Sequence, residues 1–390
     1  MNPRARMEYL ESIYLRYKRA NRREKSLILN EFCINCDYHR KHAIRILTKF
    51  RRWTKPKPKK RGKPSVYNKT CILEPLKRIW LASNMPCSKR LKVIIPLWLP
   101  SYAKEFGGLP LETVKALLRI SHATIDRLLK PTRIEYTRRG RATTKPGTLL
   151  RKQIPVRTSQ WDETRPGFLE ADTVAHCGNT VAGMFIYTVN FTDIVTEWTE
   201  QRAVWGKGET GVLEQIKGVE NNLPFDLLGF DSDNGGEFIN HHLIRHFAQR
   251  NQPVSFTRSR SYRKDDNCHV EQKNWTHVRQ WFGNYRLNEL KIVPLMNDLY
   301  KSEWRLYHNF FLPSVKLVEK KVVASKTVKC YDTPKTPYQR VLESPEVPIS
   351  VKRSLKEQFE NLNPFQLRKT MEKKLKRIFD IYHKGNLKCQ

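Results

Sequence analysis

The sequence predicts an α/β core with a mixed five-stranded sheet flanked by helices, preceded by all-helical, basic domains. Residues 1–132 carry apolar side chains at helical spacing and no strand pattern. Residues 167–282 instead alternate strand-like stretches with helical ones. The 73 Lys and Arg residues against 38 Asp and Glu give a formal net charge of +35, which is typical of a protein that binds a polyanion.

The composition also bounds the cellular setting. No stretch approaches the ~20 apolar residues of a membrane span, so we expect no membrane association. The N-terminus is not followed by the continuous apolar segment of a signal peptide. Eight scattered cysteines fit free thiols in a reducing compartment. We therefore expect a cytoplasmic, nucleoid-associated protein.

Changes in composition and periodicity predict six segments. They are a helix-turn-helix domain (1–52), a basic linker (53–70), a second helix-turn-helix-like domain (71–132), a basic connector (133–160), the sheet domain (161–290) and a helical, basic C-terminal region (291–390). Residues 51–64 contain eight basic residues, no acidic residue and three prolines, which exclude a regular helix there. In the C-terminal region we expect helix to about residue 309, then irregular chain, and a basic helix over 364–383.

Residues 1–52 predict three short helices. Asn21 is expected to cap the second helix, which carries Leu27, and Asp37 the third. In the third helix Ala43, Ile44 and Leu47 are expected to face inward. The basic residues expected to face outward and contact DNA are Arg40, Lys41 and Arg45. A three-helix bundle with a solvated basic face is the alternative.

Four residues of zinc-ligand type occur in the same segment: Cys33, Cys36, His39 and His42. The cysteines and histidines are separated by only two residues, which is far shorter than a zinc-finger loop. Zinc binding and a buried thiol beside two exposed histidines both remain open.

The second helical domain and its connector repeat this theme. Ser88 is expected to cap one helix there, and helices over 111–119 and 122–130 flank a turn in which Ser121 caps the second. The connector that follows contains three further candidate DNA contacts, Arg138, Arg139 and Arg141.

The sheet domain has the predicted order β-β-β-α-β-α-β-α. Its strands are expected at 167–176, 184–195, 197–205, 225–230 and 254–257, and its helices at 208–221, 240–249 and 266–282. The first and fourth strands are expected to be neighbours, with the last helix packed across them.

Three carboxylates from this domain are expected to converge. Asp172 lies within the first strand, Asp233 follows the fourth strand at an Asp-Asn-Gly-Gly turn, and Glu271 opens the last helix. Clustered like charges are costly unless they are cancelled, and oxygen ligands favour Mg²⁺ or Mn²⁺. Two such ions per site catalyse in-line phosphoryl displacement. Acids that compete for the role are Glu170 and Asp231, one strand repeat away, and Asp265 and Asp266.

The motifs Glu170-Ala171-Asp172-Thr173, 233–238 (Asp-Asn-Gly-Gly-Glu-Phe) and 269–271 (His-Val-Glu) resemble the D,D-E motif of retroviral-type integrases and bacterial insertion-sequence transposases. The last two acids are separated by 37 residues, close to that family's spacing. The resemblance covers residues 160–290. It implies an RNase H-like fold, Mg²⁺ dependence, and DNA strand cleavage followed by strand transfer. It also implies that Asp172, Asp233 and Glu271 are the metal ligands, with Asp172 bridging both ions.

The chain departs from this family in two places. The His-His-Cys-Cys zinc unit of retroviral integrases is not matched by the order Cys-Cys-His-His at 33–42. The loop at 261–267 lacks the family's frequent glycine. His176 and His269 lie near the carboxylates in sequence, and we expect both to be structural.

Basic residues around the third carboxylate are predicted to contact DNA phosphates. They are Arg258, Arg260, Arg263 and Lys264 in the loop, and Lys273 and Arg279 on the helix. The predicted function is a DNA transposase or integrase that acts on double-stranded DNA, at element ends and target, as a homodimer or higher oligomer. The alternatives are a two-metal nuclease of the same fold and a non-catalytic DNA-binding regulator derived from a transposase.

Overall fold

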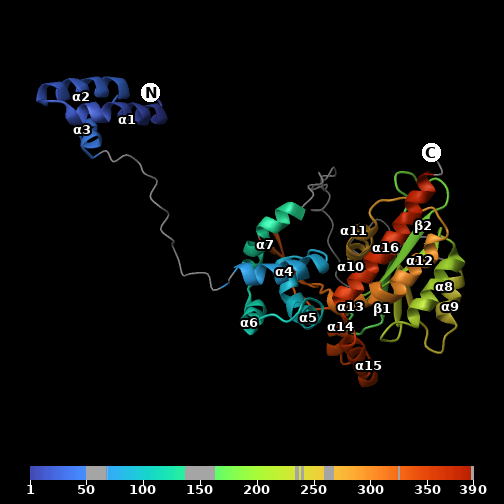
Figure 1. Ribbon diagram of the computed structural model, residues 1–390. Coiled ribbons are helices and arrows are strands. Elements are labelled where there is room, and N and C mark those ends of the chain that lie inside the picture. The colour runs from blue at the N-terminus through green and yellow to red at the C-terminus, as the bar shows by residue number, and fades with distance from the viewer. Residues whose placement is uncertain are drawn as a thin grey trace. The chain divides into compact units, whose positions relative to one another are not determined.

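The computed structural model describes residues 1–49, 67, 69–136, 163–232, 237–238, 241–258, 268–323 and 326–387. The chain divides into two compact units, Met1–Val66 and Tyr67–Gln390, which are described separately (Figure 1).

The first unit contains three helices, as predicted, and they pack as a bundle. Its helices are α1 (Pro3–Arg19), α2 (Arg22–Cys36) and α3 (Arg40–Lys49). Asn21 caps α2 in a reciprocal capping box with Glu24. The core forms around Phe32, which is fully buried together with Ala43 of α3.

Two expectations for this unit need correction: the cap of α3 and the burial of Ile44. Asp37 does not cap α3; it ends α2 in the left-handed region, with φ 55°. The carbonyl of His39 instead accepts the first hydrogen bonds of α3, from the amides of His42 and Ala43. Ile44 is 38% exposed and Leu27 is exposed, because the bundle is small and buries only one face of each helix.

The second unit begins with four helices: α4 (Lys69–Ala82), α5 (Ser88–Phe106), α6 (Leu111–Arg119) and α7 (His122–Tyr136). The α6–turn–α7 pair has the predicted start of its second helix, and Ser121 Oγ accepts from the amide of Thr124. Ser88 does not cap α5 as predicted. It is the first helical residue, and its hydroxyl donates to Asp126 of α7 at 2.8 Å.

Five strands form the sheet in the predicted order along the chain: β1 (Phe168–Ala175), β2 (Ile186–Asp193), β3 (Thr199–Trp205), β4 (Gly229–Ser232) and β5 (Ser255–Arg258). Their spatial order is β3-β2-β1-β4-β5. The first three strands are antiparallel, and β4 is parallel to both β1 and β5. The first and fourth strands are therefore neighbours, as predicted.

Helices cover both faces of this sheet. On one face α8 (Glu209–Glu220) lies against β3 and α9 (His241–Ala248) against β5, and both share a hydrophobic core with Leu169 and Ala171 of β1 (Figure 1). The other face carries α10 (Cys268–Lys273), a π-helical segment η2 (Asn274–Arg279) and α11 (Gln280–Phe282). α10 packs on β1 and β2 rather than on β1 and β4 as expected. A mixed five-stranded sheet with flanking helices fits an RNase H-like fold.

The C-terminal region contains more helices and strands than predicted. It contains α12 (Ile292–Leu299), a π-helical segment η3 (Tyr300–Trp304), α13 (Arg305–Phe311), the antiparallel strands β6 (Leu317–Val323) and β7 (Lys326–Tyr331), and the helices α14 (Pro337–Glu343), α15 (Ile349–Glu360) and α16 (Pro364–Leu387). The two strands, α14 and α15 were not predicted. Their apolar residues are interspersed with charges, which conceals the strand and helix periods in the sequence.

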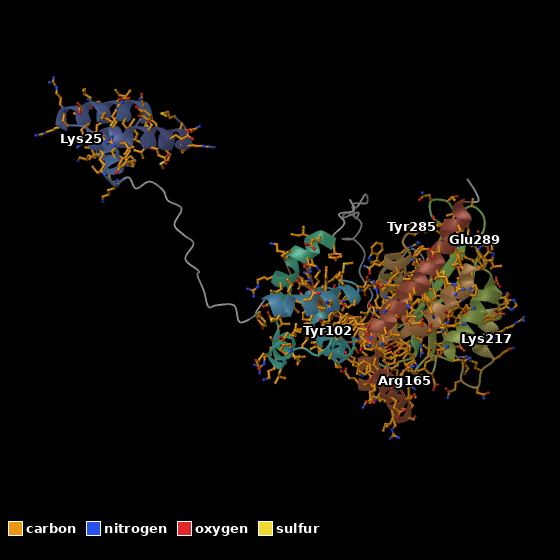
Figure 2. All side chains as sticks on the ribbon, in the orientation of Figure 1. Lys25, Tyr102, Arg165, Lys217, Tyr285 and Glu289 are labelled. Carbon is orange, nitrogen blue, oxygen red and sulfur yellow. The ribbon has the colours of Figure 1, made fainter. Side chains whose placement is uncertain are left out.

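One hydrophobic core joins α4–α7, the α10 face of the sheet and the C-terminal helices. Trp98 of α5 packs against Phe365 of α16 and donates to the carbonyl of Phe311. Tyr102, labelled in Figure 2, also packs against Phe365. The boundaries predicted near residues 132 and 290 therefore do not separate compact units. Among the described residues, no helix is long and apolar enough to cross a membrane.

Candidate active site

Asp172 lies at the fifth position of β1, on the face covered by α10 and η2. Side chains alternate along a strand, so Glu170 and Asp172 share this face while Leu169 and Ala171 enter the opposite core. The half-buried carboxylate of Asp172 accepts the Thr173 amide at 2.7 Å and the Asn274 Nδ2 at 2.6 Å. Its position and orientation are thus set by β1 and η2 together.

Glu271 lies in the first turn of α10 and is exposed. One hydrogen bond on each side of Glu271 in the sequence connects this helical segment to β1. The amide of Val270 donates to Glu170 Oε2 at 3.0 Å, and Asn274 donates to Asp172. The helix that carries Glu271 is therefore fixed on the strand that carries Asp172, although about a hundred residues separate them.

Asp233 lies outside the described residues, but the residues on either side of 233–236 are described. Ser232, which ends β4, pairs with Ala171. Glu237 is buried, accepts from Thr173 Oγ1 at 3.0 Å and pairs with Lys207 at 2.6 Å. Residues 171 and 173, which flank Asp172, thus hold the two ends of the segment that contains Asp233.

The competing acids have structural partners. Glu170 accepts from the first turn of α10, and Asp231 accepts from Thr257 Oγ1 at 2.6 Å. Asp265 and Asp266 lie outside the described residues. Within the described part of the chain, no group of three or more His, Cys, Asp or Glu side chains could hold a metal ion. Because Asp233 is not among them, that result does not include the complete predicted triad.

Two histidines, His176 and His269, lie near the predicted carboxylates in the sequence, and the structure describes the side chain of His176. His176 is fully buried, its Nε2 lies 2.8 Å from Thr188 Oγ1, and burial lowers its pKa to about 3. A histidine held neutral in this way is structural, as predicted. The side chain of His269 lies outside the described residues.

In the first unit Cys36 is buried and His39 is exposed, and the four zinc-type residues there form no metal cluster among the described residues.

A chain of side-chain amides leads to Asp172 and was not predicted. Gln201 of β3 donates to Asn190 of β2 at 2.8 Å, and Asn190 donates to Asn274 at 2.9 Å. Asn274 in turn donates to Asp172. The sequence signal that could have indicated Asn190 and Gln201 is a polar amide side chain inside a stretch predicted as a strand. In the structure both residues are buried, so their amides need hydrogen-bond partners. Each amide orients the next, so the chain delivers an N–H group to the Asp172 carboxylate.

We expect Asn274→Leu to lower any Asp172-dependent activity about 10- to 100-fold, the usual cost where a residue orients a metal ligand, which is the role proposed below for Asp172. The reason is that Asp172 loses the donor that fixes its rotamer. The measurement is the rate with wild type and variant at equal Mg²⁺, together with the Mg²⁺ concentration at half-maximal rate. Asn288→Leu, the same substitution at an exposed position after α11, is the control. Equal rates for wild type and Asn274→Leu would contradict the positioning role.

Lys273 and Arg279 differ from the prediction that they contact DNA. Lys273 is only 4% exposed and forms an ion pair with the buried Glu197 at 2.8 Å. Burial lowers the pKa of Lys273, and Glu197 opposes that shift. Arg279 donates to the carbonyl of Ala175 at 2.7 Å. The helix turns both side chains into the protein, which the basic pattern of the sequence does not reveal.

The remaining predicted DNA contacts divide into two sets. Arg40, Lys41 and Arg45 are exposed on α3, although Arg40 also hydrogen-bonds to Asn30 and Ser26 of α2. Those outside the described residues are Arg138, Arg139, Arg141, Arg260, Arg263 and Lys264; for Arg258 only the backbone, in β5, is described.

Two solved structures show a limited likeness to the chain. One is the crystal structure of the catalytic core domain of BIV integrase: 13% identity, 46% of this chain and 95% of that chain, TM-score 0.29. The other is a cryo-EM structure of the simian T-cell lymphotropic virus intasome in complex with PP2A regulatory subunit B56 gamma: 14% identity, 64% of this chain and 76% of that chain, TM-score 0.33. Likenesses at these values do not by themselves establish a fold or a function.

A sequence relative gives a firmer relationship. No protein-family model matches the chain. The "Uncharacterized protein y4rM" of Sinorhizobium fredii (strain NBRC 101917 / NGR234) is 38% identical over 338 residues, which cover 86% of this chain and 94% of the relative. The chain belongs to the same protein family as y4rM of Sinorhizobium fredii.

Proposed function

We propose that the protein is a DNA transposase or integrase of the D,D-E type, with Asp172, Asp233 and Glu271 as its acidic triad. One observation carries the proposal: four consecutive residues of β1 hold the segments that contain the other two acids. Glu170 and Asp172 bind the backbone of Val270 and the side chain of Asn274, on either side of Glu271. Ala171 and Thr173 bind Ser232 and Glu237, on either side of Asp233.

The donor set fits two Mg²⁺ or Mn²⁺ ions. All three proposed ligands are carboxylates, and hard oxygen donors favour these ions over zinc. When bound, the two ions would supply a water activated for attack and charge stabilisation for the scissile phosphate. The residues of the chain would orient the ligands: Asn274 at Asp172, and Glu170 at the helix of Glu271.

The proposed substrate is double-stranded DNA. The net charge of +35 supports it, as do the exposed Lys41 and Arg45 on α3 and the α6–turn–α7 pair, which we propose as two helix-turn-helix contacts. We also propose that the protein acts as a dimer or higher oligomer, because two DNA ends must be joined in one complex.

The test is a strand-transfer assay with labelled oligonucleotides from the DNA that flanks the coding region, and a plasmid target. We expect cleaved and joined products in Mg²⁺ or Mn²⁺ and none in excess EDTA, because the proposed triad would act only through the divalent cations that it would hold. Nicking without joining would favour the two-metal nuclease. DNA binding without any metal-dependent nicking would overturn the enzyme and favour the regulator.

A further inference from the structure

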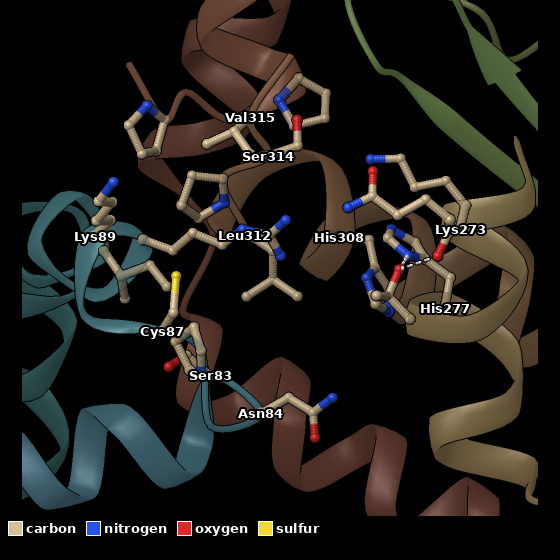
Figure 3. A pocket seen from close by; sticks show the side chains of 18 of the residues that line it. Ser83, Asn84, Cys87, Lys89, Lys273, His277, His308, Leu312, Ser314 and Val315 are labelled. Atoms are coloured by element: carbon tan, nitrogen blue, oxygen red, sulfur yellow. Dashed lines mark hydrogen bonds between the residues drawn. The ribbon is translucent and has the colours of Figure 1, made fainter. Parts of the chain in front are cut away.

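A cavity of about 510 Å³ lies in the second unit, beside the helix that carries Glu271. The turn between α4 and α5 forms one wall, and α10, η2 and α13 form the opposite wall. Figure 3 shows Cys87 and Lys89 on the first wall and His277, His308 and Lys273 on the second. Asn84 bridges the two walls by donating to Gln280 at 3.2 Å. The volume lies within the range of roughly 300–1,000 Å³ that is typical of small-molecule sites.

The second wall contains an unexplained polar group. His308 is 2% exposed, and neither of its ring nitrogens has a hydrogen-bond partner among the described residues. Its ring stacks on His277, with centroids 4.0 Å apart. Burial lowers the pKa of both histidines well below the usual value, so each ring is neutral, with one donor and one acceptor nitrogen. Leaving such atoms unpaired is costly, which points to a ligand that pairs with them.

The first wall is positively charged. The half-buried Arg90 lines the cavity and has no hydrogen-bond or ion-pair partner recorded among the described residues, and Lys89 and Lys329 line it with exposed side chains. The N-terminus of α5 also lies here, and Cys87 makes no side-chain cap, so its first amides are available to an anion. The one acidic residue of the lining, Asp332, is neutralised by Arg340 at 2.7 Å.

We propose that this cavity binds a single nucleotide of a nucleic-acid strand, with its phosphate on Arg90 and the N-terminus of α5 and its base edge on His308. A nucleotide has both groups that the two walls would bind: an anionic phosphate, and a planar base whose edge carries a hydrogen-bond donor and an acceptor. Gln272, next in sequence to Glu271, also lines the cavity. A nucleotide bound there would hold its strand beside the proposed active site, so the identity of the ligand rests on the proposed function.

The test uses the full chain in EDTA, so that catalysis is silent. Binding of deoxynucleoside monophosphates is measured by calorimetry, with inorganic phosphate and unphosphorylated deoxynucleosides as partial ligands. We expect Arg90→Ala to weaken monophosphate binding about 10- to 100-fold, as for the loss of a charged hydrogen bond, and His308→Phe about 2- to 10-fold. Lys92→Ala, an exposed residue outside the cavity on the same helix, is the matched control and should bind as wild type does.

His308→Phe keeps the ring stack and removes the unpaired nitrogens, so its melting temperature should not fall. A single-stranded oligonucleotide with 2-aminopurine tests whether the nucleotide is bound as part of a strand or only free in solution. Monophosphate binding no tighter than that of phosphate or nucleoside, or unchanged by both Arg90→Ala and His308→Phe, would overturn the proposal.

The two proposals fail separately. Asp172→Asn should leave nucleotide binding intact, so binding without any strand cleavage by the wild type would defeat only the proposed function. Cleavage with unaltered nucleotide binding by the cavity variants would defeat only the nucleotide site.

Discussion

Asp172→Asn is expected to reduce DNA cleavage and joining by roughly a thousand-fold or more. The substitution keeps the shape of the side chain but removes the charge with which it would hold divalent cations. Loss of several kcal/mol of charge stabilisation in the transition state corresponds to this factor, since each 1.36 kcal/mol is tenfold in rate. Asp233→Asn should have an effect of the same size, because the two acids are proposed to share the ions. Rates are measured with the flanking-DNA oligonucleotides in Mg²⁺ and in Mn²⁺.

Asp226→Asn is the matched control, because Asp226 is exposed and precedes β4 on the same segment. It should cleave and join as wild type does. A second comparison uses Asp231→Asn, whose partner Thr257 makes it a structural residue. Full activity of Asp172→Asn or Asp233→Asn would remove that residue from the proposed triad. If Asp231→Asn lost activity without loss of stability while Asp233→Asn kept it, the assignment would pass to Asp231.

Glu197→Gln is expected to lower the free energy of unfolding by about 3–5 kcal/mol, the usual cost of removing one partner from a buried ion pair. The Lys273 ammonium would remain 4% exposed without its counter-charge. Burial also lowers the pKa of Lys316, and Glu197 is the largest influence that opposes this shift, so the change would affect two cations. Urea unfolding of wild type and variant measures the loss.

The double variant Glu197→Gln/Lys273→Met should recover part of this loss, because neither charge is then buried. Glu112→Gln breaks the exposed ion pair with Lys115 on α6 and should change stability by less than about 1 kcal/mol. Lys273→Met also tests the original prediction of a phosphate contact. If Lys273 contacts a phosphate, the slope of log K for DNA binding against log salt concentration should fall by about one in Lys273→Met. We expect this slope to stay unchanged and the free energy of unfolding to fall.

Much of the fold could be predicted from the sequence. The strand-helix order and the adjacency of β1 and β4 follow from period and connection rules, which act locally along the chain. Asn21 was correctly predicted as a cap, because a side-chain cap and its partner are three residues apart. Asp37 was not, because aspartate also tolerates the left-handed conformation that ends a helix, and it takes that role in α2. The strands β6 and β7 were missed because charged residues interrupt their apolar pattern.

The candidate site was predictable only as a set of residue types. The sequence by itself determined that the chain carries a charge of +35, and it predicted Asp172, Asp233 and Glu271 as candidates through their resemblance to a D,D-E motif. Only the tertiary structure decided that Asn274 donates to Asp172, that Lys273 is buried against Glu197, and that His308 lines a cavity with no hydrogen-bond partner among the described residues. The physical reason is that burial and long-range hydrogen bonds depend on which faces of β1, η2 and α13 meet. Residues about a hundred positions apart share no local sequence pattern from which that contact could be predicted.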